Sequence, residues 1–205
     1  MDGKIYSSLK FDREYIVVSL TTPVCNFGWK AKTFKLVSTN NELISLEDAM
    51  GANGLLVMFI CNHCPYVKAI LPRLIHDTRE LKTLGINTVA ISSNDVINYP
   101  EDSFENMQKL AKEHEFPFDY CFDETQAVAK SYDAICTPDF FGFNNNYELQ
   151  YRGRFDSTGR GELSDNNERD LFNAMKLIAE SQKGPIDQIP SIGCSIKWKE
   201  SATNP

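Results

Sequence analysis

The sequence has little of what marks a fibrous, disordered or membrane-spanning chain. Its 205 residues include only 11 Gly and 9 Pro, too few for a collagen-like repeat, while 42% hydrophobic residues are enough to build a core. The longest apolar runs, such as residues 55–60, are far shorter than the roughly 20 residues that span a bilayer. Runs of Lys or Arg are also missing, and the formal net charge is -7. We therefore expect a soluble protein that binds neither nucleic acid nor a membrane surface.

The first 20 residues also lack the features of a secretory leader. Their apolar stretch, residues 15–20, follows charges of both signs rather than a basic segment, and no small-residue cleavage site accompanies it. We therefore expect a cytoplasmic protein. The length suits one domain. We divide the chain into an N-terminal extension (residues 1–32), a domain (33–182) and a C-terminal arm packed on or near that domain (183–205).

The six cysteines are the most informative residues of the sequence. Cys61 and Cys64 are three residues apart, whereas the other four are scattered. A disulfide framework is typical of small secreted domains, so in a reducing cytoplasm most of these cysteines should be free thiols. We interpret Cys25 and Cys121 as core residues. The close pair needs a separate explanation.

Hydrophobic periodicity predicts a mixed α/β fold. Residues 54–60 and 86–92 are apolar runs typical of strands buried on both faces, and helical spacing between them predicts a parallel crossover unit. Pro72 should kink that helix. Further predictions are hairpins over 33–46 and 140–155, a strand at 118–122, helices at 103–113 and 124–132, and a last helix capped by Asp165 or Asn166. The segment from Lys183 onward reads as a loop or arm, and Arg152, Arg154 and Arg160 read as solvated residues.

The close cysteine pair follows a predicted buried strand directly. If Cys61 caps the following helix, its sulfur lies at the positive end of the helix dipole. Thiols in that setting have a pKa of roughly 3.5–7.5 against about 8.5 when free, and Cys64 is near enough to attack a mixed disulfide on Cys61. Half of a zinc site, two inert core cysteines and a structural disulfide remain as alternatives. The position of the cysteine pair directly after a buried strand favours redox chemistry over these alternatives.

Several segments together resemble a known family. These are Cys61-Asn62-His63-Cys64 after a buried strand, Thr137-Pro138 before a later strand, the hairpin with Phe34-Lys35-Leu36, and the segment 103–122. They resemble the thioredoxin superfamily, and in particular its peroxiredoxin-like branch of alkyl hydroperoxide reductase and thiol-specific antioxidant proteins. Residues 59–68 and 190–198 further resemble uncharacterised bacterial thioredoxin-like proteins. The resemblance implies a mixed central sheet flanked by helices on both faces, with an N-terminal β-hairpin and a peroxiredoxin-like central insertion.

The resemblance also implies roles for individual residues. Cys61 would be the nucleophile, Cys64 the resolving thiol, and Pro138 a cis-proline facing them. Thr137 would offer its backbone to an extended substrate strand. His63 would stabilise the thiolate, and the alternative is that it is an exposed spacer residue.

The implied activity is thiol–disulfide exchange on protein or small disulfides. It needs no bound cofactor, because electrons come from an external thiol donor such as a thioredoxin or glutathione system. Thioredoxin's buried carboxylate six residues before the first cysteine is replaced by Leu55, so Cys64 must lose its proton in another way.

Two alternatives of activity stay open beside this prediction. A thiol peroxidase would reduce hydrogen peroxide or alkyl hydroperoxides, but Cys61 and Val57 stand where peroxiredoxins have Thr and Pro. A redox-inactive binding module would use only the sheet edge beside Thr137. Cys194 is either a third redox thiol or a free cysteine in the tail, and Cys136 could lie near the site or only fill the core.

Overall fold

A computed structural model describes residues 19–162 and 167–200. Within these ranges the strands form a seven-stranded mixed sheet of order β3-β2-β6-β5-β4-β8-β9 and a three-stranded sheet of order β1-β10-β7. Among these residues, no helix is both long and apolar enough to cross a membrane. The large sheet consists of β2 (Lys35–Ser38), β3 (Leu43–Ser45), β4 (Gly54–Phe59), β5 (Ile86–Ser92), β6 (Asp119–Phe122), β8 (Asp139–Asn144) and β9 (Leu149–Tyr151).

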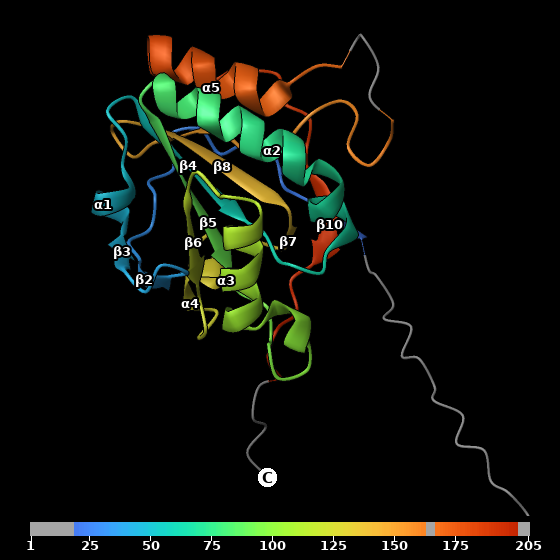
Figure 1. Cartoon of the computed structure of the whole chain (residues 1–205). Coiled ribbons are helices and arrows are strands. Elements are labelled where there is room, and N and C mark those ends of the chain that lie inside the picture. Colours follow the sequence, from blue (N-terminus) through green and yellow to red (C-terminus); the bar gives the residue numbers. More distant parts are fainter. Residues whose placement is uncertain (1–18, 163–166, 201–205) are drawn as a thin grey trace, which may run out of the picture.

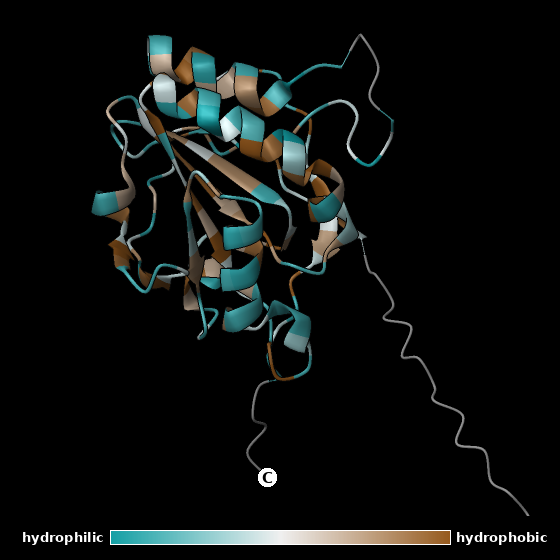
Figure 2. Cartoon of the chain, viewed as in Figure 1, coloured by the Kyte–Doolittle hydropathy of each residue, from teal (hydrophilic) through white to brown (hydrophobic). Residues whose placement is uncertain are grey.

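Helices cover both faces of the large sheet, as predicted. One apolar cluster joins β4 and β5 to α2 (Pro65–Thr83), α3 (Phe104–Glu113) and α5 (Asp170–Ser181). The other joins the opposite face to α1 (Leu46–Ala49) and α4 (Ala127–Ser131). Figure 1 shows α2 and α5 lying side by side above the sheet. Hydrophobic residues run along the central strands, while the visible face of α3 is mostly hydrophilic (Figure 2).

Strand β4 is the centre of the molecule. It runs parallel to β5 and antiparallel to β8, and all six of its residues are buried. Its continuous apolar sequence therefore follows from its position between two helical layers. Because β4 ends at Phe59, the chain that follows emerges at the carboxyl edge of the parallel strands, where the cysteine pair lies.

The predicted helices differ in detail from those of the structure. Ser103 caps α3 as expected, accepting a hydrogen bond from the Asn106 N–H. Pro72 lies inside α2 without ending it. Helix α4 begins only at Ala127, because the Asp123 carboxylate binds backbone N–H groups of its first turn. The proposed caps of the last helix, Asp165 and Asn166, lie outside the described residues; α5 begins at Asp170 and its cap position is Arg169.

The C-terminal segment contains a strand that the sequence analysis read as loop. Strand β10 (Ile192–Ser195) pairs with β1 (Ser19–Thr21) on one edge and with β7 (Cys136–Thr137) on the other, antiparallel in both cases. Strand β1 was not predicted either. Three- and four-residue strands carry too little periodicity to be recognised, and pairing between segments this distant in the chain creates them.

Arg152 is another correction, since it is not solvated. Its exposed fraction is 6%, and its guanidinium pairs with the fully buried Asp139 at 2.9 Å and donates to the carbonyl oxygen of Asp133. It also lies over the Phe141 ring. A buried charge needs such a partner, and sequence alone does not place Asp139 beside it.

Candidate functional site

The loop after β4 carries the cysteine pair, but the helix begins later than predicted. Pro65 is the first residue of α2, and Cys64 occupies the cap position without a side-chain cap hydrogen bond. The prediction that Cys61 caps the helix is wrong. A proline suits the first helical position because its fixed φ fits a helix and no hydrogen-bonding N–H is lost there.

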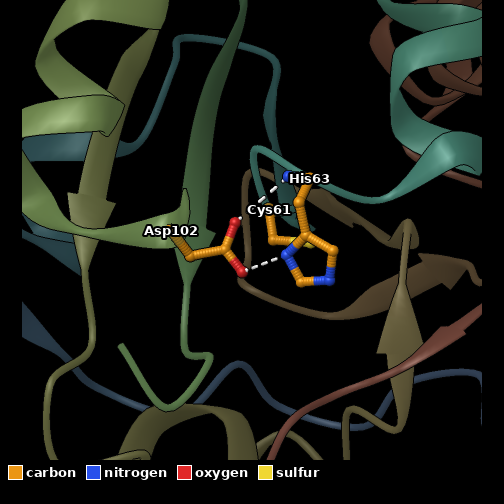
Figure 3. Close-up of side chains that lie close together, drawn as sticks. All are labelled: Cys61, His63 and Asp102. Carbon is orange, nitrogen blue, oxygen red and sulfur yellow. Dashed lines mark hydrogen bonds and ion pairs between the residues drawn. The ribbon is translucent and has the colours of Figure 1, made fainter. Parts of the chain in front are cut away.

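Asp102 explains why the loop does not continue the helix backward. Its Oδ1 accepts hydrogen bonds from the backbone N–H groups of Asn62 at 2.8 Å and His63 at 3.2 Å. These donors would otherwise be available to a capping residue. Asp102 ends a short 3-10 helix (Pro100–Asp102) in the segment between β5 and α3, and its side chain is fully buried. Figure 3 shows its carboxylate facing His63.

His63 is held by the same carboxylate. Its Nδ1 lies 2.6 Å from Asp102 Oδ2, and its ring stacks on Tyr99 with centroids 5.7 Å apart. The hydrogen bond with Asp102 raises the pKa of His63, with smaller contributions from the charges of Asp102 and Cys64. A cationic His63 beside the cysteine loop would stabilise a thiolate there.

The two sulfurs of the pair meet the Thr137-Pro138 segment, as the resemblance implied. Cys61 Sγ lies 3.4 Å from Thr137 Oγ1, and Cys64 Sγ lies 3.1 Å from the Thr137 carbonyl oxygen. The Thr137-Pro138 bond is cis. Cys61 is 1% exposed and Cys64 is fully buried. The structure thus brings Cys61, Cys64, Thr137 and Pro138 into one enclosed cluster.

Cys194 belongs to this cluster and is not a loose tail residue. It lies on β10 opposite Thr137, and its Sγ is 2.8 Å from Cys64 Sγ. Cys136, on β7, is close in sequence but its Sγ faces the Pro138 carbonyl oxygen at 3.5 Å. Three of the six cysteines, Cys61, Cys64 and Cys194, therefore lie together beside Thr137.

Negative charge in this cluster is favoured on Cys64. The neighbouring Cys194 and then Cys61 thiols lower the pKa of Cys64, and together with Thr137 they outweigh the burial that raises it. Burial raises the pKa of Cys61, and the Asp102 charge raises it further. The hydrogen bond to Cys64 likewise raises the pKa of Cys194. The expected lowering of a thiol pKa therefore falls on the second cysteine of the pair, because that sulfur has a thiol neighbour on two sides.

Sequence reasoning missed Asp102 and its neighbour Asn94. Asn94 Nδ2 donates to Asp102 Oδ2 at 2.8 Å, so both carboxylate oxygens are fully bonded. The available signal was topological. Strands β4 and β5 are parallel neighbours, so the loops that follow them must meet at one sheet edge, and a carboxylate in the second loop can reach the first.

Three of these side chains have donor atoms that could surround a metal ion. The ligand atoms of Cys61, His63 and Asp102 lie within 4.8 Å of one another. An ion there would have to compete with the hydrogen bonds that already occupy both oxygens of Asp102. The thiol contacts, in contrast, require no rearrangement.

Comparison with known proteins identifies similar chains of known structure. Residues 27–155 match the AhpC/TSA family. An uncharacterised conserved protein from Geobacillus kaustophilus has 40% identity and a TM-score of 0.85, covering 90% of this chain and 98% of its own. A hypothetical protein from Sinorhizobium meliloti has 34% identity and a TM-score of 0.83, covering 88% and 98%.

More distant structures share the fold alone. A peroxidoxin from Mycobacterium tuberculosis has 12% identity and a TM-score of 0.56, over 77% of this chain and 98% of its own. No curated protein matches the chain. The fold is therefore thioredoxin-like, as predicted.

Proposed function

Because the chain belongs to the AhpC/TSA family of thioredoxin-like thiol redox proteins, we propose that it is a thiol–disulfide oxidoreductase acting on protein or small disulfides. Cys61 and Cys64 cycle between dithiol and disulfide. The observation that carries the proposal is the convergence of both sulfurs on Thr137, with the pair's negative charge favoured on Cys64.

The charge distribution suggests how the reduced pair reacts. The hydrogen bond between the two sulfurs lets the Cys61 proton pass to Cys64. Cys61 then attacks the substrate disulfide, and the departing thiolate takes that proton from Cys64. Cys64 attacks Cys61 Sγ, the mixed disulfide breaks, and the second substrate thiolate leaves. Two electrons pass to the substrate and one disulfide forms on the protein.

Attack is assigned to Cys61 because Cys64 is enclosed. Cys64 Sγ has Cys194, Thr137 and Cys61 around it. Cys61 keeps the small exposed fraction of the pair. His63, whose pKa is raised by its hydrogen bond with Asp102, can carry a positive charge beside the cysteine loop. An external thiol donor, such as a thioredoxin or glutathione system in a reducing cytoplasm, returns the protein to the dithiol.

Activity of single-cysteine variants tests the proposal. Wild type, Cys61→Ser, Cys64→Ser and the control Cys25→Ser are compared in reduction of insulin disulfides with dithiothreitol as donor. Cys61→Ser should fall to the uncatalysed rate and Cys25→Ser should match wild type, since Cys25 lies outside the cluster. Wild-type turnover by Cys61→Ser would overturn the proposal.

A thiol peroxidase is the second candidate, favoured by the burial of the sulfurs. Exposed fractions of 1% and zero admit a small peroxide more easily than a protein strand. Peroxide would oxidise a thiolate to a sulfenic acid, which a neighbouring thiol then converts to a disulfide with loss of water. Fast hydrogen peroxide turnover together with no insulin reduction would favour this activity.

A further inference from the structure

Strand β10 lies directly against the segment that holds the cysteine pair. Cys194 is paired with Thr137 and Ser195 with Cys136 in an antiparallel register. Gly193 allows this close approach, because a Cβ there would lie 2.6 Å from the Thr137 carbonyl carbon and closer still to its oxygen. Only a residue without a side chain fits at that position.

The strand is fixed on both sides of Cys194. Before it, the Ser191 N–H donates to Thr22 Oγ1 and the Ser191 hydroxyl donates to the Pro138 carbonyl oxygen. After it, the Ile196 N–H donates to the Ile135 carbonyl oxygen at 3.1 Å. The placement of the Cys194 sulfur is thus set by main-chain contacts over the whole strand.

The Cys64 and Cys194 sulfurs are already inside van der Waals contact. Their separation of 2.8 Å exceeds a disulfide bond of about 2.05 Å by less than about 1 Å. Cys194 is 3% exposed, so its nearest sulfur partner is inside the protein and not in solvent. Cys64 is therefore positioned to bond with either of two thiols, Cys61 or Cys194.

We propose that Cys194 is an internal substrate of the cysteine pair, and that oxidation ends in a Cys64–Cys194 disulfide. The proposal rests on the function above, because the exchange begins from the Cys61–Cys64 disulfide. Cys194 loses its proton and its thiolate attacks Cys64 Sγ. The Cys61–Cys64 bond breaks as the Cys64–Cys194 bond forms, and Cys61 leaves as a thiolate that takes up the proton. One disulfide replaces another, with no net change in electrons.

The exchange changes how β10 is attached to the site. A Cys64–Cys194 disulfide joins β10 covalently to the start of α2 and keeps the edge of β7 covered, while Cys61 returns to the thiol state. In the structure, where these cysteines are free thiols, β10 covers that edge by strand pairing alone. The disulfide adds a covalent link, so β10 can leave β7 to admit a substrate strand only after a thiol donor has reduced that link.

Tryptic mapping of the oxidised protein distinguishes the two disulfides. Cys61 and Cys64 share one tryptic peptide, residues 36–68, whereas Cys194 lies in residues 184–197. Wild type, Cys61→Ser, Cys64→Ser, Cys194→Ser and Cys25→Ser are oxidised with diamide, quenched with acid, alkylated with N-ethylmaleimide and digested without reductant. Mass spectrometry then measures the internally bridged peptide 36–68 and the cross-link between the two peptides.

We expect the cross-link in wild type and Cys25→Ser, and its loss in Cys64→Ser and Cys194→Ser. In Cys61→Ser it should form more slowly, because the starting Cys61–Cys64 disulfide cannot form and diamide must oxidise Cys64 or Cys194 directly. Cys194→Ser should accumulate the internally bridged peptide. Wild type that forms only the bridged peptide overturns the inference and leaves the proposed function intact. A cross-link that survives in Cys64→Ser also overturns it, because Cys61 would then be the partner. Cross-linking without insulin reduction by wild type would instead reject the proposed function.

Discussion

At the scale of single residues, Asp102 holds the loop that carries the cysteine pair. Asp102 fixes the backbone of the 61–64 loop and the ring of His63 with one fully buried carboxylate. Thioredoxin, which this chain resembles, has a buried carboxylate six residues before its first cysteine. Here Leu55 occupies that place, and the charge comes from the neighbouring loop. Its position beside His63 gives the site a charged pair close to the thiols.

Replacing Asp102 with Asn should lower the pKa of His63, because the negative charge is lost and a neutral amide oxygen favours the imidazolium less than a carboxylate does. A raised pKa in the folded state stabilises the protein fully below the ordinary value of 6.5, and this stabilisation is lost as pH rises through the folded pKa. The stability difference between wild type and Asp102→Asn should therefore shrink as pH increases. Urea unfolding across pH and NMR titration of the His63 ring measure these effects.

A matched control for this prediction is Glu80→Gln, which removes the carboxylate facing the exposed His76. That pair lies on the surface of α2, where an ion pair contributes little. The His63 titration should not change in this variant. An unchanged His63 titration in Asp102→Asn would contradict the role assigned to the carboxylate.

At the scale of elements, β10 decides how accessible the cysteines are. Its pairing with β7 encloses Cys64, and its own cysteine completes the cluster. The helix start contributes less than the sequence suggested, because α2 begins after the pair and not at Cys61. A strand from the C-terminal segment thus replaces the helix end as the main influence on the thiols.

Gly193→Ala should displace β10 from β7, because the added Cβ overlaps the Thr137 carbonyl group. Overpacking of this kind costs about 1–3 kcal/mol of stability. We expect faster alkylation of Cys64 and less of the cross-link to Cys194. Ile192→Ala is the matched control, since that side chain on the same strand is 51% exposed. Equal Cys64 alkylation rates in Gly193→Ala and wild type would contradict this view of β10.

At the scale of the whole molecule, two helical layers and a second sheet bury the thiols together with the charged side chains of Asp139 and Arg152. Asp139 follows the Thr137-Pro138 segment, begins β8 and is fully buried with Arg152. Burial raises the pKa of Asp139 to about 6, even with the guanidinium beside it. This ion pair links the stability of the sheet under the site to pH.

The raised pKa of Asp139 has a definite sign for stability. Asp139 makes its full contribution to the free energy of unfolding below the ordinary pKa of 3.8. This contribution is lost as pH rises through about 6, because the charged carboxylate must then stay buried in the folded protein. For this group, the free energy of unfolding of wild type should fall between these two values. Asp139→Asn should lack this fall when both proteins are unfolded with urea at a series of pH values. Parallel profiles for the two proteins would contradict the assignment.

Local sequence patterns predict the central architecture and indicate thiol chemistry at the site. Three local patterns carry this information: the apolar run of β4, the cysteine pair after it and the Thr137-Pro138 step. Each can be recognised without knowing how the rest of the chain folds. The resemblance to peroxiredoxin-like proteins supplied the rest of the predicted fold, namely the N-terminal hairpin and the central insertion. Such patterns are readable because they depend on neighbours along the chain.

The groups that surround the sulfurs are brought there by packing between distant segments of the chain. Asp102 lies 38 positions after Cys64 in the sequence, and Cys194 lies 130 positions after it. Neither residue carries a local signal of its role. The Arg152–Asp139 pair and the shift of negative charge to Cys64 depend likewise on burial and on contacts between distant segments. Electrostatics and thiol geometry are properties of packing, so they appear only once the chain has folded.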